Sequence, residues 1–242
     1  MLTAYLNQVQ ALLQNPPANS TLYSPASLTA FINQARGQVA GDGECIRPPQ
    51  GLFPLTLTAG TRNYSFSLID VSSASGVAGV FNVRQVLITV ANGYAWVRPR
   101  PWEWFTFYRL NNPVPTPAQT NEWAQLGQGE TGTLWVDPIP DMAYQLNIDA
   151  ACVPIPLVDD TTPEAIPYPW TDCVQYFATY LALLASQVPA RQADGDRMLQ
   201  RYAEFLGRAR RYSTPSVLSS QYPQNQSPVR QNQLGLTLPK GG

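Results

Sequence analysis

The stretch that decides the fold is "AYQLNIDAACVP" (143–154) followed by "PWTDCVQYFATYLALLASQVP" (169–189), because the apolar period changes between them. In the first segment apolar and polar residues alternate, as they do in a half-buried strand. In the second, large apolar residues recur at helical spacing and share one face: Val174, Phe177, Tyr180, Leu181 and Leu184. The sequence therefore predicts a strand that leads, through a proline-marked crossover, into a closing helix.

Three more segments have helical periodicity. They are "MLTAYLNQVQALL" (1–13), "SPASLTAFINQARGQVAG" (24–41) and "ARQADGDRMLQRYAEFLGRARRY" (190–212). The first ends before a pair of prolines, which cannot donate the helical backbone bond. The second begins with Ser24 as a capping residue and Pro25 at the first helical position. The chain thus has two helices near its beginning and two near its end.

Between these helices apolar and polar residues alternate with a period of two. Strands are predicted in "LFPLTLTAG" (52–60), "RNYSFSLIDV" (62–71), "PWEWFTFYRL" (101–110) and "GTLWVDPIP" (132–140), and a hairpin with a type I′ turn at Asn92-Gly93 in "VFNVRQVLITVANGYAWVRPRP" (80–101). Since the four helices can pack together only if the strands are an insertion, we expect an α+β protein. Residues 1–45 and 166–212 would form an antiparallel helical bundle, 46–165 an inserted antiparallel β-rich lobe, and 213–242 an extended C-terminal arm.

The chain carries little charge for its 242 residues. Charged residues make up 13%, and the net charge is −1, against about 25% charged residues in a typical soluble domain. A surface short of charge is poorly protected against association, which indicates that much of it is covered in the working state. The neutral balance disfavours a DNA-binding regulator, as does the lack of a recognisable helix-turn-helix. No segment is long and apolar enough to span a membrane, and we expect no membrane partner.

Catalytic chemistry has few candidates in this sequence. The absence of histidine excludes Ser-His-Asp and Cys-His catalysis and most metal clusters. Asp137, Asp141 and Asp149 leave open a glycan-cleaving or glycan-binding alternative, although "VDPIPD" also reads as an ordinary strand end and turn. Cys45, Cys152 and Cys173 form no CxxC pair, which favours synthesis in a reducing compartment. We therefore expect no enzyme, no cofactor and no metal.

Aromatic and arginine residues mark two candidate contact surfaces. If 101–110 is a strand, Trp102, Trp104 and Tyr108 share a face that can meet a partner, where Trp and Tyr are enriched. Basic residues outnumber acids on the last helix and give candidate interface or lumen arginines: Arg197, Arg201, Arg208, Arg210 and Arg211. A solvated helix face with dipole complementarity explains the same arginines.

The C-terminal stretch "SVLSSQYPQNQSPVRQNQLGLTLPKGG" cannot form a core of its own. It nevertheless spaces apolar residues along an extended segment, and "QLGLTL" (233–238) alternates as a strand added to a sheet edge would. We expect an arm that binds a partner or a neighbouring subunit through Tyr222, Val229, Arg230, Leu234, Leu236 and Leu238. Ordinary fraying of a terminus is the alternative.

Two parts of the chain resemble a known family. "SLTAFINQARGQVAGDGECIR" (27–47) resembles the second helix and turn of proteins encoded near the head–tail genes of short-tailed phages. "GTLWVDPIPDMAYQLNIDAACVPIPL" (132–157), "PYPWTDCVQYFATYLALLA" (167–185) and the Tyr- and Arg-bearing last helix are similar to head-to-tail adaptor (connector) proteins. The middle strands and the aromatic run do not match.

The resemblance implies a structural virion protein, made in the host cytoplasm, that forms a dodecameric ring at the head–tail interface. Its partners would be the portal protein through the arm, the tail nozzle or hub proteins through the β-rich lobe, other copies of itself, and non-specific DNA in the lumen. A tail completion or tail-fibre-attachment protein is the alternative within this class.

Overall fold

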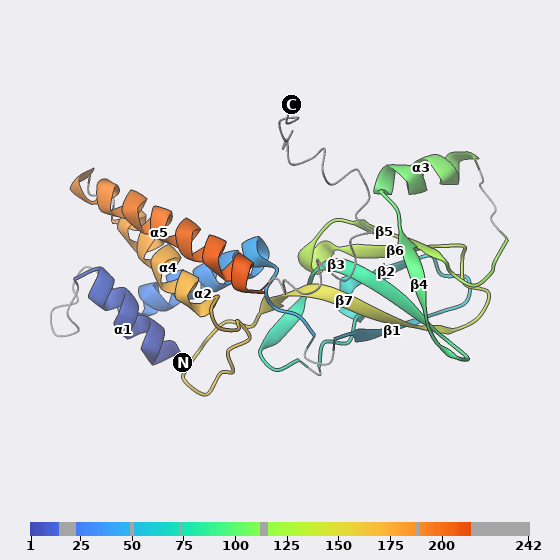
Figure 1. Ribbon diagram of the computed structural model, residues 1–242, viewed down its shortest axis with the longest axis horizontal. Coiled ribbons are helices and arrows are strands. Elements are labelled where there is room, and N and C mark those ends of the chain that lie inside the picture. Colours follow the sequence, from blue (N-terminus) through green and yellow to red (C-terminus); the bar gives the residue numbers. More distant parts are fainter. Residues whose placement is uncertain (15–22, 49–50, 73, 112–115, 187–188, 214–242) are drawn as a thin grey trace, which may run out of the picture.

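The computed structural model describes residues 1–14, 23–48, 51–72, 74–111, 116–186 and 189–213. Within them the mixed α+β class is confirmed, with four helices toward one end of an elongated molecule and a sheet with the remaining helix toward the other (Figure 1). The helices are α1 (Leu2–Leu12), α2 (Pro25–Gly43), α3 (Trp102–Asn111), α4 (Thr171–Ala185) and α5 (Pro189–Ser213). The predicted lobe boundaries at 45/46 and 165/166 stay a prediction.

Seven strands form one curled sheet in the order β1-β7-β3-β4-β5-β6-β2. They are β1 (Phe53–Leu57), β2 (Asn63–Ser65), β3 (Val77–Val90), β4 (Gly93–Pro99), β5 (Glu122–Leu126), β6 (Thr133–Asp137) and β7 (Tyr144–Pro154). The sheet is not wholly antiparallel, because β4 and β5 run parallel at Arg98↔Glu122 and Pro99↔Trp123. This parallel contact follows from α3, which lies between β4 and β5 in the sequence and reverses the chain between them.

The predicted hairpin is present, but its turn is not type I′. Val90 pairs with Gly93, so Ala91 and Asn92 form a two-residue loop. Neither loop residue has the positive φ that a type I′ turn requires, whereas Gly93 has φ 130°. Asn-Gly therefore lies at the end of the turn rather than at its centre, and glycine is suited to position 93 because it adopts a positive φ without steric cost.

The four helices from the two ends of the chain lie together. α4 packs against α5 and α2, and α1 packs against α2 and α4. The buried face of α4 differs from the predicted one, since Ala178 and Ala182 are fully buried and Leu184 is 55% exposed. Small alanines allow the helix backbones to approach closely, which a pattern of large apolar residues does not reveal. At α2, the predicted cap is confirmed by the Ser27 N–H donating to Ser24 Oγ at 3.1 Å.

A buried ion pair joins α2 to the crossover that follows β7. Arg36 is fully buried and donates from Nη2 to Glu164 Oε1 at 2.8 Å and from Nε to Glu164 Oε2 at 3.1 Å. Its Nη1 donates to the Ile155 carbonyl at 2.7 Å. One turn earlier, Asn33 binds both backbone groups of Leu157, at 2.7 and 3.0 Å. These contacts fix the chain at the point where it passes from the sheet back to the helices.

A glycine near the β5–β6 turn tests how tightly the sheet interior is packed. A Cβ on Gly132 would lie 2.4 Å from the ring of buried Phe66. We expect Gly132→Ala to lower the free energy of unfolding by about 1–3 kcal/mol, since overpacking forces the ring or backbone to shift. On the exposed face of α5, a Cβ at Gly207 meets nothing within 4 Å, so Gly207→Ala should instead raise the free energy of unfolding by about 0.5–1 kcal/mol. Urea denaturation measures both; equal effects would contradict the packing.

Candidate functional site

Two of the predicted arginines on α5 lie in exposed ion pairs along the helix. Arg197 Nη1 is 3.3 Å from Asp194 Oδ1, and Arg201 Nη1 is 3.2 Å from Glu204 Oε2. All four side chains are more than half exposed. Such pairs contribute only about 0.2–1 kcal/mol, so these arginines can exchange their partners for others at little cost.

The other three predicted arginines have different surroundings. The guanidinium of Arg208 lies 5.2 Å from the centre of the Phe205 ring. Arg210 donates to the backbone carbonyl of Asp42 at the end of α2, and Arg211 donates to the carbonyl of Gly207 on its own helix at 3.3 Å. The structure thus places all five arginines on α5, although at least Arg210 also holds that helix to α2.

The same end of α5 is fixed by a buried tyrosine. Tyr202 packs against Phe177 of α4 with ring centres 4.8 Å apart, and its hydroxyl donates to Asp42 Oδ2 at 2.6 Å. Burial, and then the bond to Asp42, raises the pKa of Tyr202 well above its usual value. The phenol is therefore a neutral donor to a carboxylate, a charge-assisted bond of the stronger kind.

Removal of this hydroxyl should be measurable. Tyr202→Phe should lower the free energy of unfolding by about 1.5–3 kcal/mol, because hydrogen bonds to charged groups contribute that much. Tyr94→Phe on the exposed hairpin strand is the matched control and should change it by less than about 0.5 kcal/mol. Chemical denaturation followed by circular dichroism checks both, and a negligible effect of Tyr202→Phe would refute the role of this bond.

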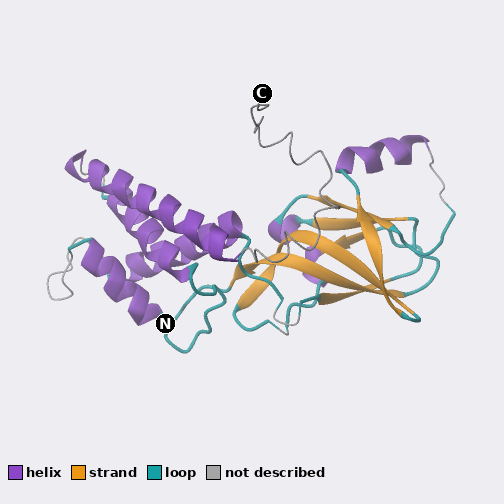
Figure 2. Cartoon of the chain, viewed as in Figure 1, coloured by secondary structure: helices purple, strands orange, loops and turns teal. Residues whose placement is uncertain are grey.

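The prediction that Trp102, Trp104 and Tyr108 share a strand face is wrong. Residues 102–111 form helix α3 beside the sheet (Figure 2), so Trp102 and Trp104 point in directions about 160° apart. Trp102 packs edge-on against Trp135 of β6, with ring centres 5.1 Å apart, and Trp104 lies under the Arg100 guanidinium at 4.9 Å. The side chain of Tyr108 lies outside the described residues.

Two aromatic residues on the sheet itself are exposed. Tyr94 and Trp96 of β4 are 63% and 60% exposed. They share the outer face of the sheet, because they are two residues apart and the next residue, Val97, is buried on the opposite face. Partner contacts are enriched in Trp and Tyr. The aromatic surface of the sheet that can meet a partner therefore lies on the hairpin rather than at Trp102 and Trp104.

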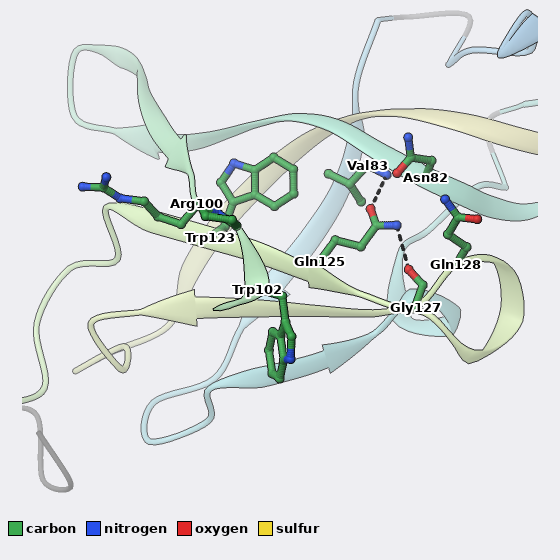
Figure 3. A pocket seen from close by; sticks show the side chains of 9 residues that line it. Asn82, Val83, Arg100, Trp102, Trp123, Gln125, Gly127 and Gln128 are labelled. Carbon is green, nitrogen blue, oxygen red and sulfur yellow. Dashed lines mark hydrogen bonds between the residues drawn. The ribbon is translucent and has the colours of Figure 1, made fainter. Parts of the chain in front are cut away.

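An open pocket of about 430 Å³ lies where β3, β5 and the start of α3 meet (Figure 3). Its lining residues come from these elements and from the turn after β5: Asn82, Val83, Arg100, Pro101, Trp102, Trp123, Gln125, Gly127 and Gln128. Trp123 is fixed by its indole N–H, which donates to the Val97 carbonyl at 3.1 Å. Arg100 is paired with Glu122 at 2.5 Å. The pocket combines aromatic walls with amide side chains.

The three aspartates of the glycan alternative have separate structural partners. Asp137 accepts from Arg62 Nη2 at 2.5 Å, and burial raises the pKa of its carboxyl although Arg62 lowers it. Asp141 accepts from the Tyr144 hydroxyl at 2.7 Å, and Asp149 lies 3.9 Å from Arg84 Nε. Asp137 and Asp149 thus pair with arginines from other segments of the sheet region, and Asp141 binds a tyrosine in its own turn region.

The thiols and the possible metal ligands can be surveyed in the described part of the chain. Burial raises the pKa of Cys45, Cys152 and Cys173 to about 12, so these free thiols stay protonated. Among the described residues, no cluster of three His, Cys, Asp or Glu is arranged to hold a metal ion. Nor does any helix in those ranges have the length and hydropathy to cross a membrane.

The predicted arm residues Tyr222, Val229, Arg230, Leu234, Leu236 and Leu238 lie outside the described residues. Sequence reasoning missed β5, because "NEWAQL" follows a proline-rich loop and is only five residues long as a strand. It also missed the Arg36–Glu164 pair and the Gln125 amide in the pocket. The sequence signal that could have indicated the buried ion pair was Arg36, a single arginine within the apolar pattern of α2.

Comparison with protein families found a match over residues 2–231 to the family described as SU10 adaptor protein. The match includes every described helix and strand. Comparison with curated proteins found no match.

Proposed function

Because the chain belongs to the SU10 adaptor protein family, a phage head-to-tail adaptor family, we propose that it is the ring subunit joining the portal to the tail. Membership makes it a phage adaptor, a structural component of the virion that interacts with other head–tail proteins. The proposal adds a ring, dodecameric by resemblance, that encloses the DNA channel. The observation that carries it is the family match over nearly the whole chain.

The shape and internal bonding of the subunit support a connecting role. The bundle of α1, α2, α4 and α5 lies at one end of the molecule and the sheet, with α3 beside it, at the other (Figure 1), so each end can face a different partner. Between them, the buried Arg36–Glu164 pair and the Asn33–Leu157 bonds hold the crossover. A subunit fixed at this junction transmits force between its two ends without bending there.

The exposed side chains suit contacts in an assembly. Arg197 and Arg201 form only exposed ion pairs, and arginine readily forms forked bonds with carboxylates or phosphates. We propose that they contact a neighbouring subunit or the DNA in the lumen, where binding to phosphates needs no sequence readout. Tyr94 and Trp96, on the sheet at the other end, would contact the tail proteins.

The protein is proposed to act without catalysis. The aspartates that a glycosidase would need are bound to Arg62, Tyr144 and Arg84. Synthesis in the host cytoplasm, where thiols stay reduced, fits the three free cysteines.

Mixing the purified protein with portal rings tests the proposal. A complex whose mass corresponds to a portal ring plus a ring of this chain is expected by native mass spectrometry. A portal ring from an unrelated phage is the control and should bind nothing. Failure to bind the cognate portal in any ratio would refute portal joining, and a tail completion protein would then be favoured if tail proteins bind instead.

A further inference from the structure

Among the residues that the structure describes, two strand edges face the pocket and no strand lies between them. β4 pairs with β3 only along Val86–Val90, so the earlier part of β3 is paired with β7 alone. β4 pairs with β5 only at Glu122 and Trp123, so residues 124–126 of β5 are paired with β6 alone. Within the described ranges, the sheet is therefore open between Asn82–Val83 and Gln125, where the pocket lies.

A side-chain amide spans this opening. The Val83 N–H donates to Gln125 Oε1 at 2.9 Å, and Gln125 Nε2 donates to the Gly127 carbonyl at 2.7 Å (Figure 3). One donor and one acceptor on a planar amide are the groups that a peptide bond offers. The Gln125 amide thus makes the bonds that a backbone unit of an inserted strand would make.

The lining of the pocket differs between its two sides. Val83 and Trp123 are buried and form an apolar wall, whereas Asn82, Gln125 and Gln128 supply amides. A strand placed here needs apolar residues at every second position and small or polar ones between them. The volume of about 430 Å³ lies within the range of about 300–1,000 Å³ usual for ligand pockets.

The chain itself contains a segment with this pattern. In "QLGLTL", Leu234, Leu236 and Leu238 alternate with Gln233, Gly235 and Thr237. Pro239 follows and would end the pairing.

The end of α5 is connected to the pocket through the end of α2. Arg210, three residues before the end of α5, donates to the Asp42 carbonyl. Glu44, two residues after Asp42, accepts a hydrogen bond from Asn82 Nδ2 at 3.1 Å, and Asn82 lines the pocket. Residues 214–232 between α5 and Gln233 can span roughly 60 Å when extended, which is ample for this path.

We infer that residues 233–238 add as a short strand between β3 and β5 of the same chain in the free subunit. The Gln125 amide swings out, and the inserted backbone binds Val83 N–H and Gly127 C=O in its place. Attachment to the same chain gives the segment an effective concentration in the millimolar range, which favours it over a segment from a second copy. The inference concerns the free subunit and does not depend on portal joining.

Hydrogen exchange on the full-length free protein tests this inference. Amides of 233–238 should exchange at least about tenfold more slowly than those of 219–228, because strand bonds protect them. Replacing Leu234, Leu236 and Leu238 together with aspartate should remove this protection and also raise exchange at 82–85 and 124–127. The control Val217→Asp with Leu218→Asp, upstream in the same segment, should change neither.

The exchange rates distinguish a strand formed by residues 233–238 of the same chain from the alternatives. Free-chain exchange rates at 233–238 would overturn it, as would protection there with no response at 82–85 and 124–127 in the triple variant. Protection that grows with protein concentration would assign the site to a second copy and overturn the same-chain assignment. Concentration-independent protection lost only in the triple variant supports it.

Discussion

Replacing Arg36 with methionine is expected to lower the free energy of unfolding by about 3–5 kcal/mol, because removing one partner leaves Glu164 buried and uncompensated. The Glu164 side chain is only 7% exposed, and Arg36 is its ion-pair partner at 2.8 Å. Methionine fills much of the arginine volume, so the loss reports the charge and its hydrogen bonds rather than a cavity. Urea titration followed by tryptophan fluorescence measures the change.

Arg84→Met provides the matched control for this prediction. Arg84 pairs with Glu44 at 3.0 Å, but both side chains are about one third exposed. An exposed pair of this kind contributes about 0–1 kcal/mol. Losses of similar size in the two variants would contradict the claim that the buried pair fixes the crossover.

Removal of residues 214–242 is expected to weaken association with portal rings by at least about 100-fold, or about 2.7 kcal/mol, while the fold stays intact. The described helices and strands end at Ser213, so the described core is kept, and the free energy of unfolding should fall only by the roughly 1–2 kcal/mol that a strand with about tenfold protection at 233–238 contributes. Sedimentation of the complex measures association, and chemical denaturation measures stability.

A chain of the same length and composition with residues 214–242 scrambled is the control for this deletion. It should bind portal rings as weakly as the truncated chain, because alternation and spacing rather than bulk carry the contact. Unchanged binding by the truncated chain would refute the arm as the portal contact and leave the ring itself to be tested separately.

The order of elements could be read from the sequence because the period of apolar residues changes clearly between segments. The prediction failed at "PWEWFTFYRL", because six of the nine residues 102–110 are apolar and fit both the helical period and the strand period of two. Pro101 directly before Trp102 favours a helix start, and the Thr106 hydroxyl donates back to the Trp102 carbonyl at 3.2 Å. Local composition alone did not distinguish a helix from a strand there. The packing of Trp102 on Trp135, which joins α3 to the sheet, is a tertiary contact that local composition does not reveal.

The contacts between segments that are far apart in the sequence could not be predicted. Arg36 and Glu164 are 128 residues apart, and Asp42 and Tyr202 are 160 apart. Neither pair has a local pattern that names its partner. The pocket depends on where β4 stops pairing, which is a property of strand lengths and of the turn into α3. The α5 arginines, in contrast, followed from a local excess of basic residues on one predicted helix.

Cryo-electron microscopy of virions with this chain labelled tests the central claim most directly. The account predicts a closed ring of this chain between portal and tail, with its helices toward the lumen or the neighbouring subunits and DNA passing through. Density for the label elsewhere in the tail, or as single copies without a ring, would contradict it.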